Sequence, residues 1–236
     1  MSRSSCFDSA SRSEASFDNT HVDNTYVDSA RFDAIATEVY LHGFSVQANA
    51  LPLALAKKLH ARMTSLPPEA FERAGIGRHE SHQHNQAVRS DRIRWLDSAD
   101  VSVDGEWLKW AEQLQQALNR RLFLGLFSFE SHFAHYRAGD FYRRHIDAFK
   151  GQASRTVSLV VYLNRDWDEA CGGELVLYRD REDQKGIQVV PSFAKVVVFL
   201  SEEFPHEVLP ATRDRYSIAG WFRVNTSDSG RIDPPS

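Results

Sequence analysis

The residues best suited to chemistry in this chain are His145 and Asp147, which are separated by one residue. In an extended strand, residues two apart point to the same side, so the imidazole and the carboxylate can converge on one metal ion. The pair would supply two of a possible three protein ligands for that ion. Alone it is a weak signal, because the same spacing occurs at His21 and Asp23, where we interpret it as coincidence.

A third ligand is expected from His206, within the sequence Pro205-His206-Glu-Val. Pro205 favours an extended approach to a short strand. Two histidines and one carboxylate on a common face, with the other positions open, form the facial triad of non-haem Fe(II) oxygenases. The alternative at this point is that His206 only caps a turn.

The strand after His206 favours the metal interpretation, because one of its faces carries an arginine. A buried arginine costs on the order of several kcal/mol unless an anion meets it. A dicarboxylate co-substrate would meet Arg215 through a bidentate contact. The charges also balance, since Fe(II) and Arg215 offset Asp147 and 2-oxoglutarate. Arg213 competes for this role but lies in the turn before the strand. Alternation predicts one face with Arg215, Ser217, Ala219 and Trp221, and another with Tyr216, Ile218 and Phe222.

A second strand, over residues 155–163, has the same two-faced character. Its odd positions from Val157 to Leu163 are purely apolar and should pack on helices. Its even positions place Thr156, Ser158 and Tyr162 on one face, which should line a pocket. The alternative for Tyr162 is a half-buried strand aromatic without a ligand.

The period of the hydrophobic residues changes from 3.6 to 2 beyond residue 126. The first part predicts helices over about 28–43, 49–65 and 107–122, with Asp28 as the first N-cap. The second part predicts short strands separated by turn residues. We expect an α+β fold, a double-stranded β-helix (jelly roll) of about eight strands with N-terminal helices packed on one sheet. The expected strands are 44–47 and 92–96, then 127–137, 141–147, 155–163, 174–179, 186–190, 194–200, 206–209 and 215–224.

Composition divides the chain into a disordered polar tail at 1–27, one domain over 28–226, and a flexible C-terminal tail at 227–236. Residues 69–90 hold few apolar positions and three close histidines. No cysteine or acid sits at partner spacing, so we interpret this stretch as a mobile polar loop rather than a metal site. The three histidines are His79, His82 and His84.

Bulk properties exclude several classes of protein. The formal net charge is −4, so no global basic field would attract nucleic acid or anionic lipid, and we expect neither as a partner. Cys6 and Cys171 make no disulfide framework, which fits a reducing compartment. The sequence contains no run resembling a signal peptide or a membrane span of roughly 20 apolar residues. We therefore expect a cytoplasmic protein.

Together these motifs resemble the 2-oxoglutarate- and Fe(II)-dependent prolyl 4-hydroxylases. The resemblance covers about residues 30 to 225, in order and with matching spacing. It is closest to the subgroup that contains the hypoxia-inducible-factor prolyl hydroxylases and their bacterial counterparts. The runs that carry it are Val88-Arg-Ser-Asp91-Arg-Ile-Arg-Trp95, Tyr136, Tyr142-Arg-Arg-His145-Ile-Asp147, Arg155, Tyr162-Leu-Asn-Arg-Asp166-Trp167, Gly172-Gly173-Glu-Leu175, Pro205-His206-Glu-Val and Arg215-Tyr-Ser-Ile-Ala-Gly-Trp221.

The resemblance implies a role for each of these positions. Iron would be bound by His145, Asp147 and His206. The catalytic set would include Arg215, which with Tyr162 would hold the distal carboxylate of 2-oxoglutarate. Tyr136 would also contact the co-substrate, and Leu175 would form its apolar wall. Residues 75–91 would be the mobile loop that closes over the substrate. Substrate-binding positions would be Asp91, Tyr142, Arg155 and Trp221.

The implied reaction is hydroxylation of a prolyl residue in a protein, of the peptidyl-prolyl or procollagen-proline 4-hydroxylase type, with oxygen consumed and 2-oxoglutarate decarboxylated to succinate. Ascorbate is a further candidate cofactor. Two features depart from the animal enzymes: Ala219 stands where they carry threonine, and their long C-terminal helix has no counterpart after Val224. One alternative is a 2-oxoglutarate oxygenase acting on a free amino acid, another small molecule or an alkylated base. The other is a metal-binding module without catalysis.

Overall fold

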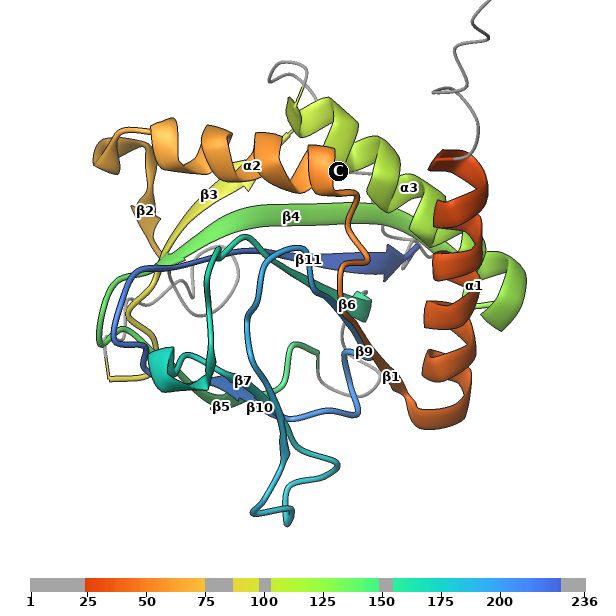
Figure 1. Ribbon diagram of the computed structural model, residues 1–236. Helices are drawn as coiled ribbons and strands as arrows, with labels where there is room; N and C mark the ends of the chain where they lie inside the picture. Colours follow the sequence, from red (N-terminus) through yellow and green to blue (C-terminus); the bar gives the residue numbers. More distant parts are fainter. Residues whose placement is uncertain (1–23, 75–86, 98–102, 149–154, 226–236) are drawn as a thin grey trace, which may run out of the picture.

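The computed structural model describes residues 24–74, 87–97, 103–148 and 155–225, and its strands form two antiparallel sheets (Figure 1). The larger sheet has the order β1-β9-β6-β11-β4-β3-β2, and the smaller sheet has the order β5-β10-β7-β8. The strands are β1 (Phe44–Gln47), β2 (Glu72–Arg73), β3 (Arg92–Leu96), β4 (Leu126–Tyr136), β5 (Tyr142–His145), β6 (Arg155–Tyr162), β7 (Leu175–Leu177), β8 (Ile187–Val189), β9 (Val196–Leu200), β10 (His206–Val208) and β11 (Arg215–Val224).

Three helices, α1 (Asn24–His42), α2 (Leu53–Ser65) and α3 (Val103–Leu122), cover one side of the larger sheet (Figure 1). The apolar residues of α3 recur every three or four positions, which gives the helix one buried stripe. Acidic residues in its first turn and arginines in its last turn also suit the helix dipole. The buried stripe consists of Trp107, Trp110, Ala111, Leu114, Ala117 and Leu118.

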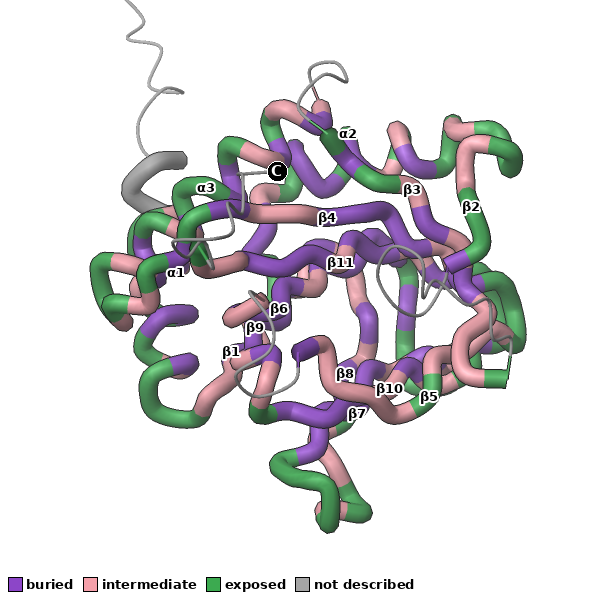
Figure 2. The backbone as a smooth tube through the Cα atoms, turned by 180° about the vertical axis from the view of Figure 1, so that it is seen from behind, coloured by how far each residue is buried: buried purple, intermediate pink, exposed green. Residues whose placement is uncertain are grey.

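The central strands of the larger sheet are buried along most of their length (Figure 2). Their two faces serve different purposes, as alternation predicted. Toward the helices, β6 and β11 contribute Val157, Leu159, Val161, Ile218 and Phe222 to the main hydrophobic core. Toward the smaller sheet, they contribute Ser158, Arg215, Ser217, Ala219 and Trp221 to a cavity. The predicted jelly roll with helices on one sheet is therefore confirmed.

Some predicted boundaries were wrong. The first helix begins at Asn24, so residues 24–27 are helical rather than part of the tail, and Asp28 is not its N-cap. The second helix begins at Leu53, with Pro52 as its N-cap, and so starts later than predicted. Strand β2 was not predicted, because it has only two residues and both are exposed and charged. The rest of the predicted N-terminal tail and the histidine cluster lie outside the described residues. Within the described part, no helix is long and apolar enough to span a membrane.

Candidate active site

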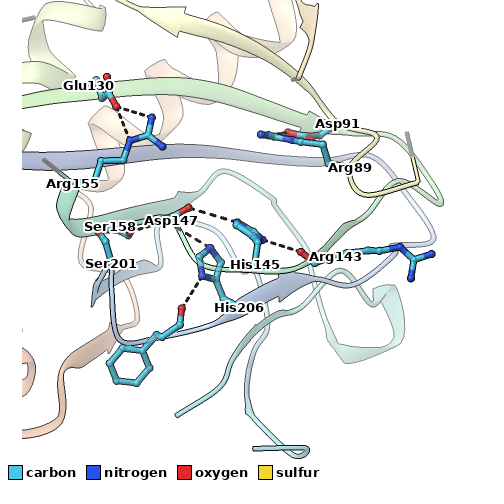
Figure 3. A network of polar contacts seen from close by, with 11 residues as sticks. Arg89, Asp91, Glu130, Arg143, His145, Asp147, Arg155, Ser158, Ser201 and His206 are labelled. Atoms are coloured by element: carbon cyan, nitrogen blue, oxygen red, sulfur yellow. Dashed lines mark hydrogen bonds and ion pairs between the residues drawn. The ribbon is translucent and has the colours of Figure 1, made fainter. Parts of the chain in front are cut away.

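Strand register brings the three predicted metal ligands together at the edge of the smaller sheet (Figure 3). His145 ends β5 and His206 begins β10, and the antiparallel pairing places the two directly opposite each other. Asp147 lies in a bend just beyond β5, whereas the sequence had predicted it within the strand. One ligand atom from each residue lies within 4.8 Å of the others. The Nε2 atoms of His145 and His206 are 3.5 and 3.6 Å from the two carboxylate oxygens of Asp147.

The backbone fixes the tautomer of both histidines. Nδ1 of His145 lies 2.8 Å from the carbonyl oxygen of Arg143, and Nδ1 of His206 lies 3.0 Å from that of Phe204. A carbonyl oxygen only accepts hydrogen bonds, so each neutral ring carries its proton on Nδ1. The Nε2 lone pairs are therefore left facing Asp147. Two imidazole nitrogens and one carboxylate, held in this way, are a donor set suited to Fe(II).

Electrostatics also favour the protonation states that metal binding requires. Burial would raise the pKa of Asp147, but the neighbouring His206 and His145, with a hydrogen bond from Ser158, hold it well below its ordinary value. Burial and the neighbouring His145 lower the pKa of His206 to about 4. At neutral pH the site therefore presents an ionised carboxylate and a neutral His206 imidazole.

The second half of the site is built around Arg215, which is 1% exposed. Its Nε donates to the Gly173 carbonyl oxygen at 2.8 Å, and its Nη1 donates to Ser217 Oγ at 3.2 Å. No ion pair with a described acidic side chain compensates its charge. Gly173 is required here, because its φ is +73° and a Cβ would lie 3.2 Å from Cδ of Arg215.

The hydroxyl of Tyr162 is a second group beside Arg215 that suits an anionic ligand. Tyr162 is fully buried and its ring centroid is 5.1 Å from the Arg215 guanidinium. Its Oη is buried without a hydrogen-bond partner in the part of the chain that the structure describes. Burial raises its pKa to about 12, so the hydroxyl keeps its proton and can donate. A buried cation and a buried proton donor, neither with an acidic partner among the described residues, fit the distal carboxylate of 2-oxoglutarate.

The triad and Arg215 share one cavity of about 900 Å³ between the two sheets. Tyr136 and Leu175, both predicted to line the co-substrate site, are buried in its wall. The guanidinium of Arg215 also lies 5.0 Å from the centroid of the Tyr136 ring. The cavity is at the upper end of the range for small-molecule sites, so it has room for more than the co-substrate.

The cavity also holds three of the four predicted substrate-binding residues. The Arg155 guanidinium lies 3.7 Å from the centroid of Trp221 and is held by Glu130 at 2.7 Å (Figure 3). Tyr142 stacks on the ring of His145, with centroids 3.6 Å apart. These contacts give the substrate positions fixed orientations next to the metal ligands.

The fourth predicted position, Asp91, needs a correction. Its side chain is buried and does not line the cavity, because its carboxylate is turned onto Arg89. Arg89 lies in the cavity wall instead, 4.2 Å from the centroid of the Tyr142 ring. We therefore interpret Asp91 as the residue that holds Arg89. The rest of the predicted mobile loop, residues 75–86, lies outside the described residues.

Sequence reasoning missed several residues of the cavity wall. His132 and Trp95 form an aromatic cluster with Trp221, with Trp95 still 48% exposed. The alternation of β4 places His132 on the same face as Tyr136, so this position could have been found. Arg89 lies two residues before Asp91 in the run from Val88 to Trp95 that carries the family resemblance, but no role was predicted for it.

Comparisons with known proteins agree with this geometry. The family model of the 2OG-Fe(II) oxygenase superfamily matches residues 131–223. Human Egl nine homolog 1 is 29% identical over 144 residues, which cover 57% of this chain and 33% of that protein. The chain thus spans about a third of this curated relative.

Two solved structures extend the similarity over most of the chain. A prolyl hydroxylase of Trichoplax adhaerens, solved in complex with a hypoxia inducible factor oxygen degradation domain peptide fragment, has a TM-score of 0.71 at 24% identity, covering 83% of this chain and 90% of that one. It supports the fold. A Pseudomonas putida prolyl-4-hydroxylase has a TM-score of 0.72 at 39% identity, covering 82% of this chain and 98% of that one. With the metal triad, the buried Arg215 and these similarities in place, the chain belongs to the prolyl 4-hydroxylase family of 2-oxoglutarate- and Fe(II)-dependent oxygenases.

Proposed function

We propose that this protein hydroxylates a prolyl residue of a protein substrate, using Fe(II), oxygen and 2-oxoglutarate. The observation that carries the proposal is the single cavity in which the triad of His145, Asp147 and His206 adjoins the buried Arg215. A module without catalysis would need neither the open metal positions nor, beside them, a buried cation that forms no ion pair with a described acidic side chain.

The chain's own residues would prepare the site for this reaction. The triad would hold the iron, which together with 2-oxoglutarate would supply the oxidising chemistry that places an oxygen on a C–H bond of the substrate. Arg215 and Tyr162 would bind the distal carboxylate of 2-oxoglutarate and so fix the position of the co-substrate in the cavity. The apolar wall around Leu175 would exclude water, so that the reaction is directed to the substrate.

The choice of substrate is supported by the cavity wall beside the metal ligands and by the relatives. The Pseudomonas putida and Trichoplax adhaerens proteins are prolyl hydroxylases, and the latter was solved with a peptide fragment. In this chain, the half-exposed Trp95 and the fixed rings of Trp221 and Tyr142 offer apolar surface beside the metal ligands. A pyrrolidine ring in an extended peptide would pack against such a surface, with Arg155 available to a peptide carbonyl.

Succinate formation tests the reaction. Purified full-length protein is incubated with Fe(II), 2-oxoglutarate, oxygen and a proline-containing protein extract, with His206→Ala as the control. We expect succinate from the wild type and none from the variant. Peptide mass spectrometry should then find a gain of one oxygen on proline.

The same experiment separates the proposal from its main rival. Turnover with free amino acids or other small molecules, and none with proteins, would replace the prolyl substrate with a small molecule while leaving the chemistry intact. Absence of succinate under every iron loading and with every substrate would overturn the oxygenase function itself.

A further inference from the structure

Two buried serines lie directly behind the metal-ligating carboxylate (Figure 3). Ser158 Oγ, on β6, donates a hydrogen bond to Asp147 Oδ2 at 2.7 Å. Ser201 Oγ, just beyond β9, lies 2.9 Å from Ser158 Oγ. The backbone N–H of Ser201 donates to the carbonyl oxygen of Thr156 at 3.0 Å, which ties Ser201 to β6. Both serines are at most 1% exposed.

Counting protons gives this chain of hydroxyls a direction. An ionised carboxylate only accepts hydrogen bonds, so the single proton of Ser158 must point to Asp147. The contact between the two hydroxyls then requires Ser201 to donate and Ser158 to accept. A hydroxyl that accepts one bond becomes a better donor for the next, and a bond to a charged acceptor is among the stronger ones. Ser201 therefore orients and strengthens the bond from Ser158.

The bond matters because the two Asp147 oxygens face different histidines. Oδ2 is 3.6 Å from Nε2 of His206, and Oδ1 is 3.5 Å from Nε2 of His145. The terminal torsion of an aspartate is broad, so the carboxylate plane is poorly fixed by the side chain alone. Asp147 also lies in a bend beyond β5 and lacks the support of a strand ladder. Ser158 lies in the larger sheet and Ser201 is bonded to it through the Thr156 carbonyl oxygen, so the two serines give the carboxylate a fixed partner.

We propose that Ser158, oriented by Ser201, is a positioning residue that fixes the Asp147 carboxylate for metal binding. The inference rests on the proposed function, since it assigns the partners of the same metal site. It predicts a graded effect. Loss of Ser158 removes the direct bond, whereas loss of Ser201 only weakens it. Because Ser201 acts through Ser158, its removal should have no further effect once Ser158 is gone.

Metal affinity is the measurement that tests this role without turnover. Metal-free full-length protein is titrated with Mn(II) in a calorimeter, with His206→Ala as the variant that should lose binding. We expect Ser158→Ala to weaken Mn(II) binding by about 10-fold or more, and Ser201→Ala by a smaller factor. Ser158→Thr, which keeps the hydroxyl, should bind close to wild-type affinity. The double Ala variant should match Ser158→Ala.

Ser131→Ala is the matched control. Ser131 is also a fully buried serine of the larger sheet, but it faces the helices and accepts a hydrogen bond from Trp107 Nε1. Its variant should keep wild-type Mn(II) affinity. Wild-type affinity in Ser158→Ala, or an equal loss in Ser131→Ala, would overturn the inference. If Ser158→Ala does not fold, the Mn(II) affinity of Ser201→Ala is the deciding measurement. Wild-type affinity in Ser201→Ala would then overturn the inference.

The outcome also distinguishes this inference from the proposed function. Wild-type protein that binds no Mn(II) and forms no succinate would mean that the function itself is wrong. If the wild-type protein binds Mn(II) and forms succinate, and Ser158→Ala binds Mn(II) with unchanged affinity, the proposed function stands. Only the positioning role of Ser158 and Ser201 would then be wrong.

Discussion

Arg89 and Asp91 form a bidentate ion pair at the wall of the active-site cavity, with Nε 2.8 Å from Oδ1 and Nη2 2.7 Å from Oδ2. The Asp91 side chain is completely buried, and that of Arg89 is 11% exposed. Burial alone would lower the pKa of Arg89, but the hydrogen bond and charge of Asp91 raise it above its ordinary value. Arg89 thus stays charged beside Asp91 while it lies over Tyr142.

Removing one partner of this pair should destabilise the fold. Asp91→Asn removes the buried carboxylate charge that forms the bidentate pair with Arg89, so we expect the free energy of unfolding to fall by about 3 kcal/mol. Denaturant unfolding of the metal-free protein measures the loss. The double variant Arg89→Met with Asp91→Leu removes both charges and should recover part of it. A single Asp91→Asn variant as stable as the wild type would show that the pair does not support the fold.

A second prediction concerns the co-substrate. Arg215→Lys keeps the positive charge but cannot form two parallel hydrogen bonds to a carboxylate. We expect KM for 2-oxoglutarate to rise about 10-fold, which corresponds to about 1.4 kcal/mol of binding energy. Succinate formation as a function of 2-oxoglutarate concentration measures it.

Arg213→Lys is the control for that variant. Arg213 is exposed, donates to the Asp166 carbonyl oxygen and lies in the turn before β11, so its replacement should leave KM unchanged. If Arg213→Lys raised KM and Arg215→Lys did not, the assignment of the anion-binding arginine would be reversed.

The faces of β6 and β11 could be predicted from the sequence because alternation is local, and each strand carries its polar and apolar sides in its own order. The metal ligands were predicted by type and spacing. The register between strands that are distant in the sequence could not be predicted, because no local pattern encodes it. Ser201 reaches Ser158 only because β9 pairs with β6, with Leu200 opposite Val157. Asp91 was predicted to bind substrate, but only the tertiary structure shows its carboxylate turned onto Arg89 and absent from the cavity wall.

A third prediction tests the side-chain packing between the neighbouring strands β11 and β4. Gly220 lies in β11, and a Cβ there would be 2.6 Å from Cζ of Phe129 and 2.8 Å from Cβ of Ser131. Gly220→Ala should therefore lower the free energy of unfolding by about 2 kcal/mol through overpacking. Gly105→Ala in α3, where no atom lies within 4 Å of the added Cβ, should raise it by up to about 1 kcal/mol. Equal denaturation midpoints for the two variants would contradict this packing.

His132 should make the stability of the protein depend on pH. Burial lowers its pKa to about 4, and the charges of Arg89 and Arg155 act in the same direction, while Asp91 opposes them. An unfolded histidine has a pKa of about 6.5, so the unfolded chain binds the proton first and stability falls as pH drops from about 6.5 toward 4.

We expect His132→Gln, which does not titrate, to lose less stability on acidification than the wild type. Between pH 7 and pH 5 the difference in free energy of unfolding between the two proteins should shift by about 2 kcal/mol in favour of the variant. His206 also has a lowered pKa, but it is present in both proteins, so its contribution cancels in the comparison. Urea unfolding of the metal-free proteins at several pH values gives the two slopes. Parallel slopes would mean that His132 takes up its proton as readily in the folded protein as in the unfolded chain.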